Sequence, residues 1–299
     1  MKIIFFFTVM SIFSNTSFAA EENAEGCVVI LTDSEGLTAP NAQGKTGFGE
    51  TVHRHIRQEL PEFSVYSKLV GGSNVASWSK GGPAPYEVTT IENDGRAVNQ
   101  NGFNVPNGED NIPIQSIEGQ LSHCNSNGPK ILLILAGANM LWDGSGASSR
   151  NRAFVERIRK AGFHCTWIGP PNVRISHRAP ADWLRKYTKL SGAVPGSSNY
   201  DRVLEEQVDS ELSEQVDQSG GCHYISSLAS TDINKIGSDG YHYPSTATNA
   251  WAQKLIPSID RDLQRVIHSP NTQTADGLQS NPRFLGAAGN NYDSDARGE

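Results

Sequence analysis

The stretch Lys130–Ala136, KILLILA, is apolar at every position after the lysine and decides the fold class. A second stretch, Cys27–Leu31 with the sequence CVVIL, has the same character. Continuous apolar runs of this length are typical of strands buried on both faces, as in a parallel sheet covered by helices. Between the two stretches, Val52, Ile56 and Leu60 recur every four positions and indicate one of those helices.

Strand patterns and helix patterns alternate along the chain. Strands are expected at 27–31, 63–70, 130–136, 165–169 and 223–227, and helices at 48–60, 114–124, 149–161, 181–189, 198–216 and 245–267. This alternation predicts an α/β fold, a three-layer α/β/α sandwich with a five-stranded, mainly parallel sheet. Residues 78–113 are rich in Gly, Asn and Pro and are expected to form a long loop.

The N-terminal 20 residues have the layout of a secretory signal peptide. Lys2 is followed by an apolar run over 3–13 and by small residues that end in Ala19 and Ala20. The run is shorter than the roughly 20 residues needed to span a bilayer, so cleavage near Ala19 or Ala20 is expected rather than stable membrane insertion. The sequence therefore predicts a protein exported to the periplasm or the medium.

Composition divides the remaining chain into two parts. Residues 21–268 are expected to form one large domain, and 269–299, rich in Asn, Gly, Asp and Ser, a disordered polar tail. The net charge of −7 becomes −8 when Lys2 is removed with the signal peptide. A mildly acidic chain without a basic stripe is a poor candidate for binding nucleic acid or anionic lipid.

Four cysteines suggest two disulfides in an exported protein, with free buried thiols as the alternative. Each cysteine lies just before or at the start of a predicted strand. With the flavodoxin-type strand order 2-1-3-4-5, Cys27 approaches Cys124, and Cys165 approaches Cys222. This pairing is the prediction, although the sequence alone allows three connectivities. No CxxC pair or His cluster indicates a metal site.

Polar residues and glycines follow the predicted strands where ligands bind in open parallel sheets. Asp33-Ser34 follows the first strand, Gly71-Gly72-Ser73 the second, and Gly137-Ala138-Asn139 the third. A fourth segment, Asp239–His242, precedes the last helix. Taken singly, each segment is more often a turn or a helix cap.

Their order along the chain resembles the four blocks of the SGNH hydrolases, also called the GDSL esterase/lipase superfamily. The matches are Thr32-Asp33-Ser34, Gly72, Gly137-Ala138-Asn139 and Asp239-Gly240-Tyr241-His242, so that the resemblance spans residues 28–267. It implies the flavodoxin-like fold of that family. The chain departs from the family pattern at Thr32, Glu35 and Met140, where the family commonly has Gly, an apolar residue and Asp.

The resemblance implies a role for each matched residue. Ser34 would be the nucleophile, His242 its base, and Asp239 the partner of the second imidazole nitrogen. The backbone N–H groups of Ser34 and Gly72 and the side-chain amide of Asn139 would form the oxyanion hole, with Gly71 as an alternative to Gly72. Asp33 is expected to shape the turn instead of joining the triad, and no cofactor is required.

The loop expected at 78–113 is placed to wall the mouth of this site. It is polar, and its aromatic residues, Trp78 and Tyr86 among them, suit packing against sugar rings. The predicted function is hydrolysis of small acyl esters, above all acetyl esters, on a carbohydrate or cell-wall glycan. Alternatives are a broader lipase, thioesterase or acyltransferase with the same triad, and a catalytically degenerate glycan-binding domain.

Overall fold

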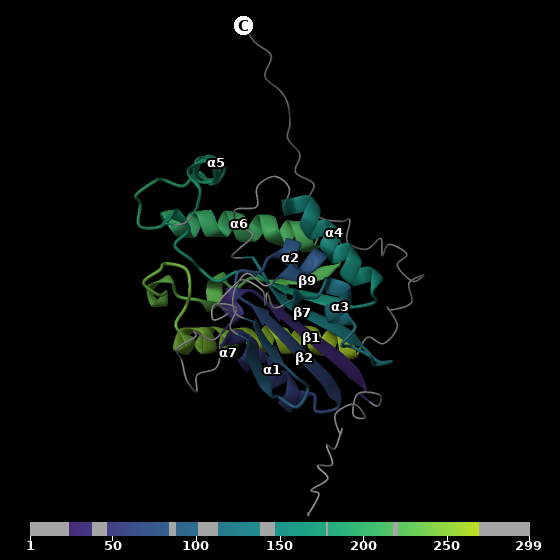
Figure 1. Ribbon diagram of the computed structural model, residues 1–299. Helices are drawn as coiled ribbons and strands as arrows, with labels where there is room; N and C mark the ends of the chain where they lie inside the picture. The colour runs from purple at the N-terminus through teal and green to yellow at the C-terminus, as the bar shows by residue number, and fades with distance from the viewer. Residues whose placement is uncertain are drawn as a thin grey trace, which may run out of the picture.

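The computed structural model describes residues 24–37, 47–83, 88–100, 113–137, 147–177, 179–217 and 221–268. The predicted signal peptide and the predicted tail lie outside these ranges. The described chain forms a mixed α/β structure around one large sheet with helices on both faces (Figure 1). The predicted three-layer α/β/α sandwich is therefore confirmed.

The sheet has seven strands, not the five predicted, in the order β5-β4-β2-β1-β7-β8-β9. The strands are β1 Gly26–Thr32, β2 Phe63–Val70, β4 Val88–Ile91, β5 Ala97–Gln100, β7 Lys130–Leu135, β8 His164–Ile168 and β9 Cys222–Ile225. The five strands β2-β1-β7-β8-β9 are parallel and follow the expected order 2-1-3-4-5.

The two additional strands arise from part of the segment predicted as a long loop. β4 pairs antiparallel with β2, and β5 pairs antiparallel with β4, so that a hairpin extends one edge of the sheet. The β-branched run Val88–Ile91 suits a strand, and Gly95 supplies the positive φ of the connecting turn. The loop prediction for residues 78–113 is wrong here because the polar character of the segment concealed a short edge hairpin. A second, two-stranded sheet joins β3 Gly82–Pro83 to β6 Pro113–Ile114.

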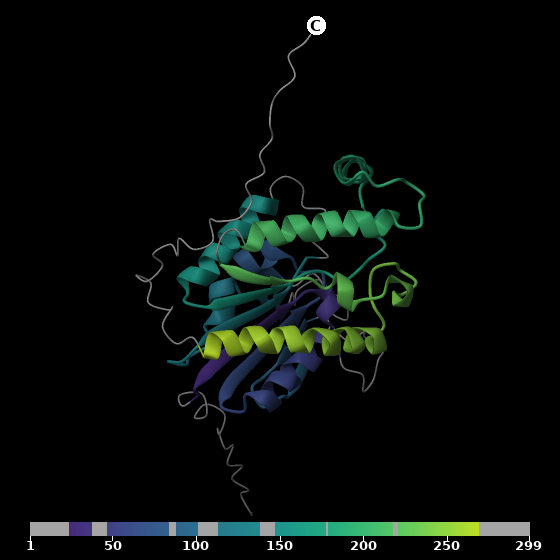
Figure 2. The same cartoon turned by 180° about the vertical axis from the view of Figure 1, so that it is seen from behind.

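Helices cover both faces of the large sheet (Figures 1 and 2). One face carries α1 Phe48–Glu59 and α7 Ser245–Ile267. The other carries α2 Val75–Lys80, α3 Ile117–Leu121, α4 Ala147–Lys160 and α6 Tyr200–Asp217. The helix expected at 114–124 is thus shortened to α3, because residues 113–114 pair in the small sheet.

The central strands are apolar throughout because each contributes side chains to both faces. In β1, Val28 and Ile30 join the core beneath α1 and α7, whereas Val29 and Leu31 join the core beneath α4 and α6. All seven residues of β1 are buried. This two-sided burial explains why the run lacks the apolar–polar alternation of a half-exposed strand.

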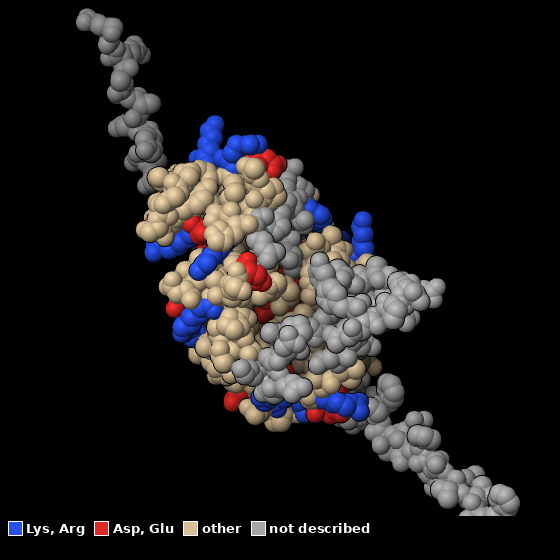
Figure 3. Space-filling view, turned by 60° about the vertical axis from the view of Figure 1, so that its left-hand side comes forward, with Lys and Arg blue, Asp and Glu red and all other residues tan. Residues whose placement is uncertain are grey.

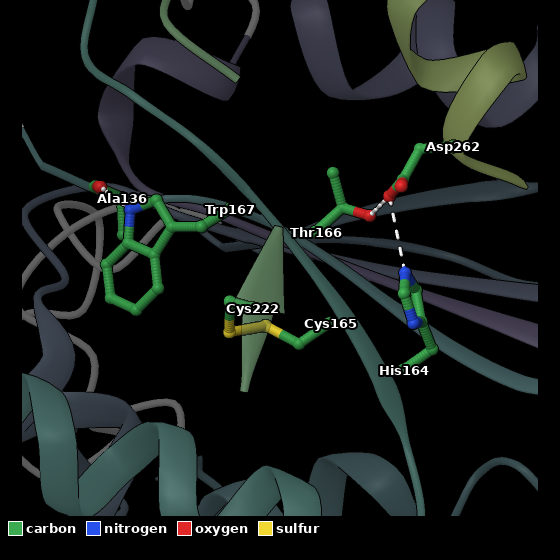
Figure 4. The surroundings of a disulfide bond; sticks show 7 residues. All are labelled: Ala136, His164, Cys165, Thr166, Trp167, Cys222 and Asp262. Carbon is green, nitrogen blue, oxygen red and sulfur yellow. Dashed lines mark hydrogen bonds and ion pairs between the residues drawn. A yellow bond between two sulfur atoms is a disulfide. The ribbon is translucent and has the colours of Figure 1, made fainter. Parts of the chain in front are cut away.

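Both predicted disulfides are present. Cys27 is bonded to Cys124 and Cys165 to Cys222, with Cα–Cα separations of 5.6 and 4.4 Å. The second bond links directly paired residues of β8 and β9. Figure 4 shows its surroundings, including the Trp167 indole that lies near Ala136, whose carbonyl accepts a 2.7 Å hydrogen bond from Nε1.

A third apolar cluster extends the fold at the end where the parallel strands finish. It joins α5 Ala181–Ser191 and the N-terminal half of α6 to Tyr241, which precedes His242. Short 3-10 helices η5 Ile175–His177, η6 Leu228–Ser230 and η7 Ile233–Lys235 lie in the connections of this region. Within the described ranges, no helix combines the length and apolar character needed to cross a bilayer.

Candidate active site

The sharp turn after β1 presents Ser34. β1 ends at Thr32, and the single-turn 3-10 helix η1 Ser34–Gly36 follows. Asp33 caps this turn, since its Oδ1 accepts a 3.0 Å hydrogen bond from the Glu35 backbone N–H. Gly36 is required by packing, because a Cβ there would lie 2.0 Å from Thr32 Oγ1. The hydroxyl of Ser34 is consequently held at the carboxyl end of a central strand.

The loop before α7 presents Asp239 and His242. Asp239 Oδ1 accepts hydrogen bonds of 3.0 Å from the backbone N–H groups of both Tyr241 and His242. Gly240 adopts a φ of 70°, and its carbonyl accepts a 2.9 Å hydrogen bond from the Arg174 backbone N–H. These hydrogen bonds fold the carboxylate of Asp239 back toward the imidazole three positions later in the same loop.

The two segments meet although Ser34 and His242 are 208 positions apart in the sequence. His242 Nδ1 lies 2.6 Å from Asp239 Oδ2, and His242 Nε2 lies 3.2 Å from Ser34 Oγ. The side chain of His242 is 48% exposed, so a substrate can approach the serine and imidazole from solvent. The structure thus brings a hydroxyl, an imidazole and a carboxylate into one hydrogen-bonded chain.

Electrostatics favour the ionised form of Asp239. Burial acts to raise its pKa, but hydrogen bonds from the Tyr241 backbone and from His242 outweigh burial and hold the pKa below the ordinary value. An ionised carboxylate beside Nδ1 keeps a proton on that nitrogen. The Nε2 lone pair then faces Ser34, which is the tautomer a general base requires.

Asp33 lies beside the same site but in a different environment. It is 1% exposed, and its carboxyl bonds to the backbone of Glu35 and Gly137 rather than to an imidazole. Burial raises its pKa to about 7, although those backbone hydrogen bonds oppose the rise. Its position agrees with the expected role in shaping the turn.

Gly72 lies in the turn that follows β2, next to the turn of Ser34. Leu69 pairs with Thr32 in the parallel register of β2 and β1, so both strands finish at the same level. The φ of Gly72 is 70°, a backbone conformation that favours glycine. Asn139 lies outside the described residues, whereas Gly137 of the same block is buried at the end of β7. The oxyanion-hole roles of Gly72 and Asn139 remain predictions.

The structure overturns the predicted sugar-binding role of Trp78. This residue lies in α2 and is fully buried, at 0% exposure, within the core cluster beneath that helix. Asn74 and Ser77 form a reciprocal capping box that begins the helix, and this sequence signal was missed within a polar segment. Tyr86 lies outside the described residues.

Sequence patterns did not reveal the surroundings of Glu35. Its side chain turns inward to 2% exposure beside the nucleophile turn. A charged residue in a Gly-rich stretch ordinarily indicates a solvated loop. The one sequence feature that pointed to Glu35 was its position directly after Ser34.

Two other histidines lie beside a buried carboxylate away from Ser34. His164 and His223 lie 3.4 and 3.2 Å from the buried carboxylate of Asp262. Figure 4 shows His164 and Thr166 pointing toward Asp262, on the side of β8 opposite Cys165 and Trp167. Among the residues that the structure describes, no group of three or more His, Cys, Asp or Glu side chains is arranged to hold a metal ion.

Figure 3 brings forward the side of the molecule that lies on the left in Figure 1. In the coloured part of this face, Lys and Arg are interspersed with Asp and Glu, and a few acidic atoms are recessed in a hollow.

Sequence comparisons give no relative: no family model matches the chain, and no curated protein matches it. Solved structures that align with it include a carbohydrate acetylesterase family member from Sinorhizobium meliloti, at 13% identity over 80% of this chain and 99% of that chain, with a TM-score of 0.45. A psychrotrophic esterase from Pseudoalteromonas sp. aligns at 13% identity over 80% of this chain and 98% of that chain, with a TM-score of 0.44. An acetyl xylan esterase aligns at 11% identity over 78% and 99% of the two chains, with a TM-score of 0.43. These three solved structures are described as esterases, and their likeness to this chain is one of fold.

Proposed function

We propose that this chain is an exported serine esterase of the SGNH hydrolase type that hydrolyses short acyl esters. The observation that carries the proposal is the hydrogen-bonded chain from Ser34 through His242 to Asp239. A serine hydroxyl is a weak nucleophile until a positioned base accepts its proton. The arrangement supplies such a base, and it supplies a carboxylate that fixes the tautomer of that base.

The proposed reaction has two halves. Ser34 Oγ attacks the acyl carbon while its proton passes to His242 Nε2, and the tetrahedral intermediate collapses when that proton is given to the departing alcohol. A water molecule then attacks the acyl carbon of the acyl-enzyme and gives a proton to His242 Nε2. The second tetrahedral intermediate collapses when that proton passes to Ser34 Oγ, which releases the acid and restores the hydroxyl. In this scheme the oxyanion is stabilised by the N–H groups of Ser34 and Gly72 and by the amide of Asn139, and the loss of one such donor costs about 10²–10³ in turnover.

The proposed substrate is an acetyl or similarly short ester on a carbohydrate. The polar composition of residues 84–112 supports a sugar more than a long acyl chain, whereas Trp78 is buried in the core and out of reach of a substrate. Export is supported by the signal-like N-terminus and is compatible with the two disulfides. Sequencing the N-terminus of the mature protein would test cleavage near Ala19 or Ala20.

The deciding experiment compares the wild type with Ser34→Ala on p-nitrophenyl acetate, butyrate and octanoate, and on acetylated xylan. Ser226→Ala, a change of the same kind at an exposed serine, is the matched control. We expect activity that falls with chain length, is abolished in Ser34→Ala and is retained in the control. A fluorophosphonate should phosphonylate Ser34 in the wild type with loss of fluoride, which adds the mass of the reagent less that of HF. An inactive, unlabelled wild type would contradict the proposal and favour the glycan-binding alternative.

A further inference from the structure

Tyr243 directly follows the proposed base, yet no step of the proposed acyl transfer uses its side chain. It is buried to 7% exposure, and its hydroxyl donates a 2.8 Å hydrogen bond to the backbone carbonyl of Asn172, 71 positions earlier in the chain. Burial raises the pKa of this phenol above its ordinary value, so the hydroxyl remains a protonated donor at neutral pH. The bond joins the loop before α7 to the segment that follows β8.

The carbonyl that accepts this hydrogen bond belongs to a residue that is itself held in place. The Asn172 side-chain amide donates hydrogen bonds of 2.8 Å to the Leu228 carbonyl and 3.2 Å to the Thr231 carbonyl, at the two ends of η6. Its backbone N–H donates a 3.0 Å hydrogen bond to Thr231 Oγ1. The backbone N–H of the next residue, Val173, donates to the buried carboxyl of Glu205 in α6. The segment after β8 is therefore a fixed support for the loop before α7.

Two hydrogen bonds to this support flank His242. The Gly240 carbonyl, two residues before His242, accepts a 2.9 Å hydrogen bond from the Arg174 backbone N–H. The Tyr243 hydroxyl, one residue after His242, makes the second bond. The side chain of His242 is itself 48% exposed, so packing around the imidazole restrains it little. The distance from the imidazole to the nucleophile consequently depends on where the backbone of its loop is held.

We propose that Tyr243 is a positioning residue whose hydroxyl, bonded to the Asn172 carbonyl, holds His242 at the distance it needs from the nucleophile. The inference rests on the proposed function, since it concerns the same Ser34–His242 pair. The two reacting atoms are 3.2 Å apart, at the upper end of the usual hydrogen-bond range, so a small outward shift of the loop would separate them. Misplacement of reacting groups by about 1 Å can cost about 10² in rate.

The test measures kcat, KM and thermal unfolding of the full chain with p-nitrophenyl acetate for Tyr243→Phe, which keeps the buried ring and removes only the hydroxyl. We expect kcat to fall about 10- to 100-fold with KM unchanged. The pH dependence of kcat should keep its shape, because Asp239 and His242 belong to one loop and move together. Tyr187→Phe is the matched control and should keep its kcat, because it removes a similar 2.7 Å hydrogen bond, to Glu211, that joins α5 to α6 instead of holding this loop.

A double-mutant cycle tests whether the effect passes through Asn172. Asn172→Ala removes the side-chain amide that bonds to the Leu228 and Thr231 carbonyls, and so releases the support from η6. We expect this variant also to lower kcat. Because both changes release the same contact, the double variant with Tyr243→Phe should lose little more than the more impaired single variant.

Several outcomes separate this inference from a purely structural role. Wild-type kcat in Tyr243→Phe would overturn it, as would an equal loss in Tyr187→Phe, a loss that only follows the unfolded fraction, or additive losses in the cycle. If Asn172→Ala fails to fold, Tyr243→Phe and its control still decide. Equal activity of the wild type and Ser34→Ala would overturn the proposed function and the inference with it. Activity that depends on Ser34 but is unaffected by the Tyr243 hydroxyl would overturn the inference alone.

Discussion

Asp239→Asn removes the negative charge beside His242 and leaves the local backbone intact. The asparagine Oδ1 can still accept the N–H groups of Tyr241 and His242, which Asp239 Oδ1 accepts at 3.0 Å. The side-chain NH₂ then takes the place of Oδ2, which lies 2.6 Å from His242 Nδ1. An amide donor at this point requires Nδ1 to be an acceptor, so the imidazole proton moves to Nε2. A protonated Nε2 faces Ser34 Oγ and cannot accept its proton.

The size of the effect follows from the environment of the carboxylate. In serine hydrolases with a buried aspartate, the same change lowers kcat by about 10⁴. Here the Asp239 side chain is 36% exposed, and solvent weakens its influence. We therefore expect a loss of about 10³–10⁴ in kcat, which corresponds to about 4–5.5 kcal/mol of transition-state stabilisation. KM should change little, because Asp239 acts on the base rather than on the bound ester.

Steady-state hydrolysis of p-nitrophenyl acetate by the wild type and Asp239→Asn would measure this loss. Circular dichroism and thermal unfolding would verify that the variant is folded. Asp232→Asn is the matched control, because it makes the same substitution at an exposed residue, the N-cap of η7. If Asp239→Asn kept more than about one tenth of the wild-type kcat, the tautomer argument would be refuted and His242 would need another orienting partner.

Three further predictions concern stability, each measured as the free energy of unfolding in urea. Replacing Cys165 and Cys222 by Ala should cost about 4 kcal/mol, because the bond closes a loop with a sequence separation of 57; an unchanged midpoint would contradict this. The Asp33 carboxyl, whose pKa rises on folding from 3.8 to about 7, favours the folded state at low pH, and that stability is lost as the pH rises through about 7. Asp33→Asn should remove this decrease in the free energy of unfolding, which is on the order of 4 kcal/mol. The same dependence of that free energy on pH in the wild type and in Asp33→Asn would show that Asp33 does not titrate as described. Trp167→Phe should cost about 2–4 kcal/mol because it leaves a cavity and removes the 2.7 Å hydrogen bond to the Ala136 carbonyl; a loss below about 1 kcal/mol would show that the indole is dispensable.

The candidate site was predictable in outline because its residues lie at strand ends. Strands 27–31 and 130–136 are apolar enough to identify as buried and parallel, and this places Ser34 at the ligand-binding edge of the sheet. The resemblance paired Asp239 with His242, and the loop before α7 places Asp239 Oδ2 2.6 Å from His242 Nδ1. The separation of Ser34 and His242 in the sequence did not predict their distance in space, because that distance depends on how α7 packs beneath the sheet.

By itself, the sequence determined the buried parallel core, because continuous apolar runs are local signals. The pairing of the cysteines followed only once a flavodoxin-type strand order was assumed, since the sequence alone allows three connectivities. Only the tertiary structure decided the edge hairpin β4–β5, the burial of Trp78 and the inward position of Glu35. Each of these features depends on which element, distant in the sequence, packs against the residue. The polar or Gly-rich composition of the adjacent residues does not identify that element.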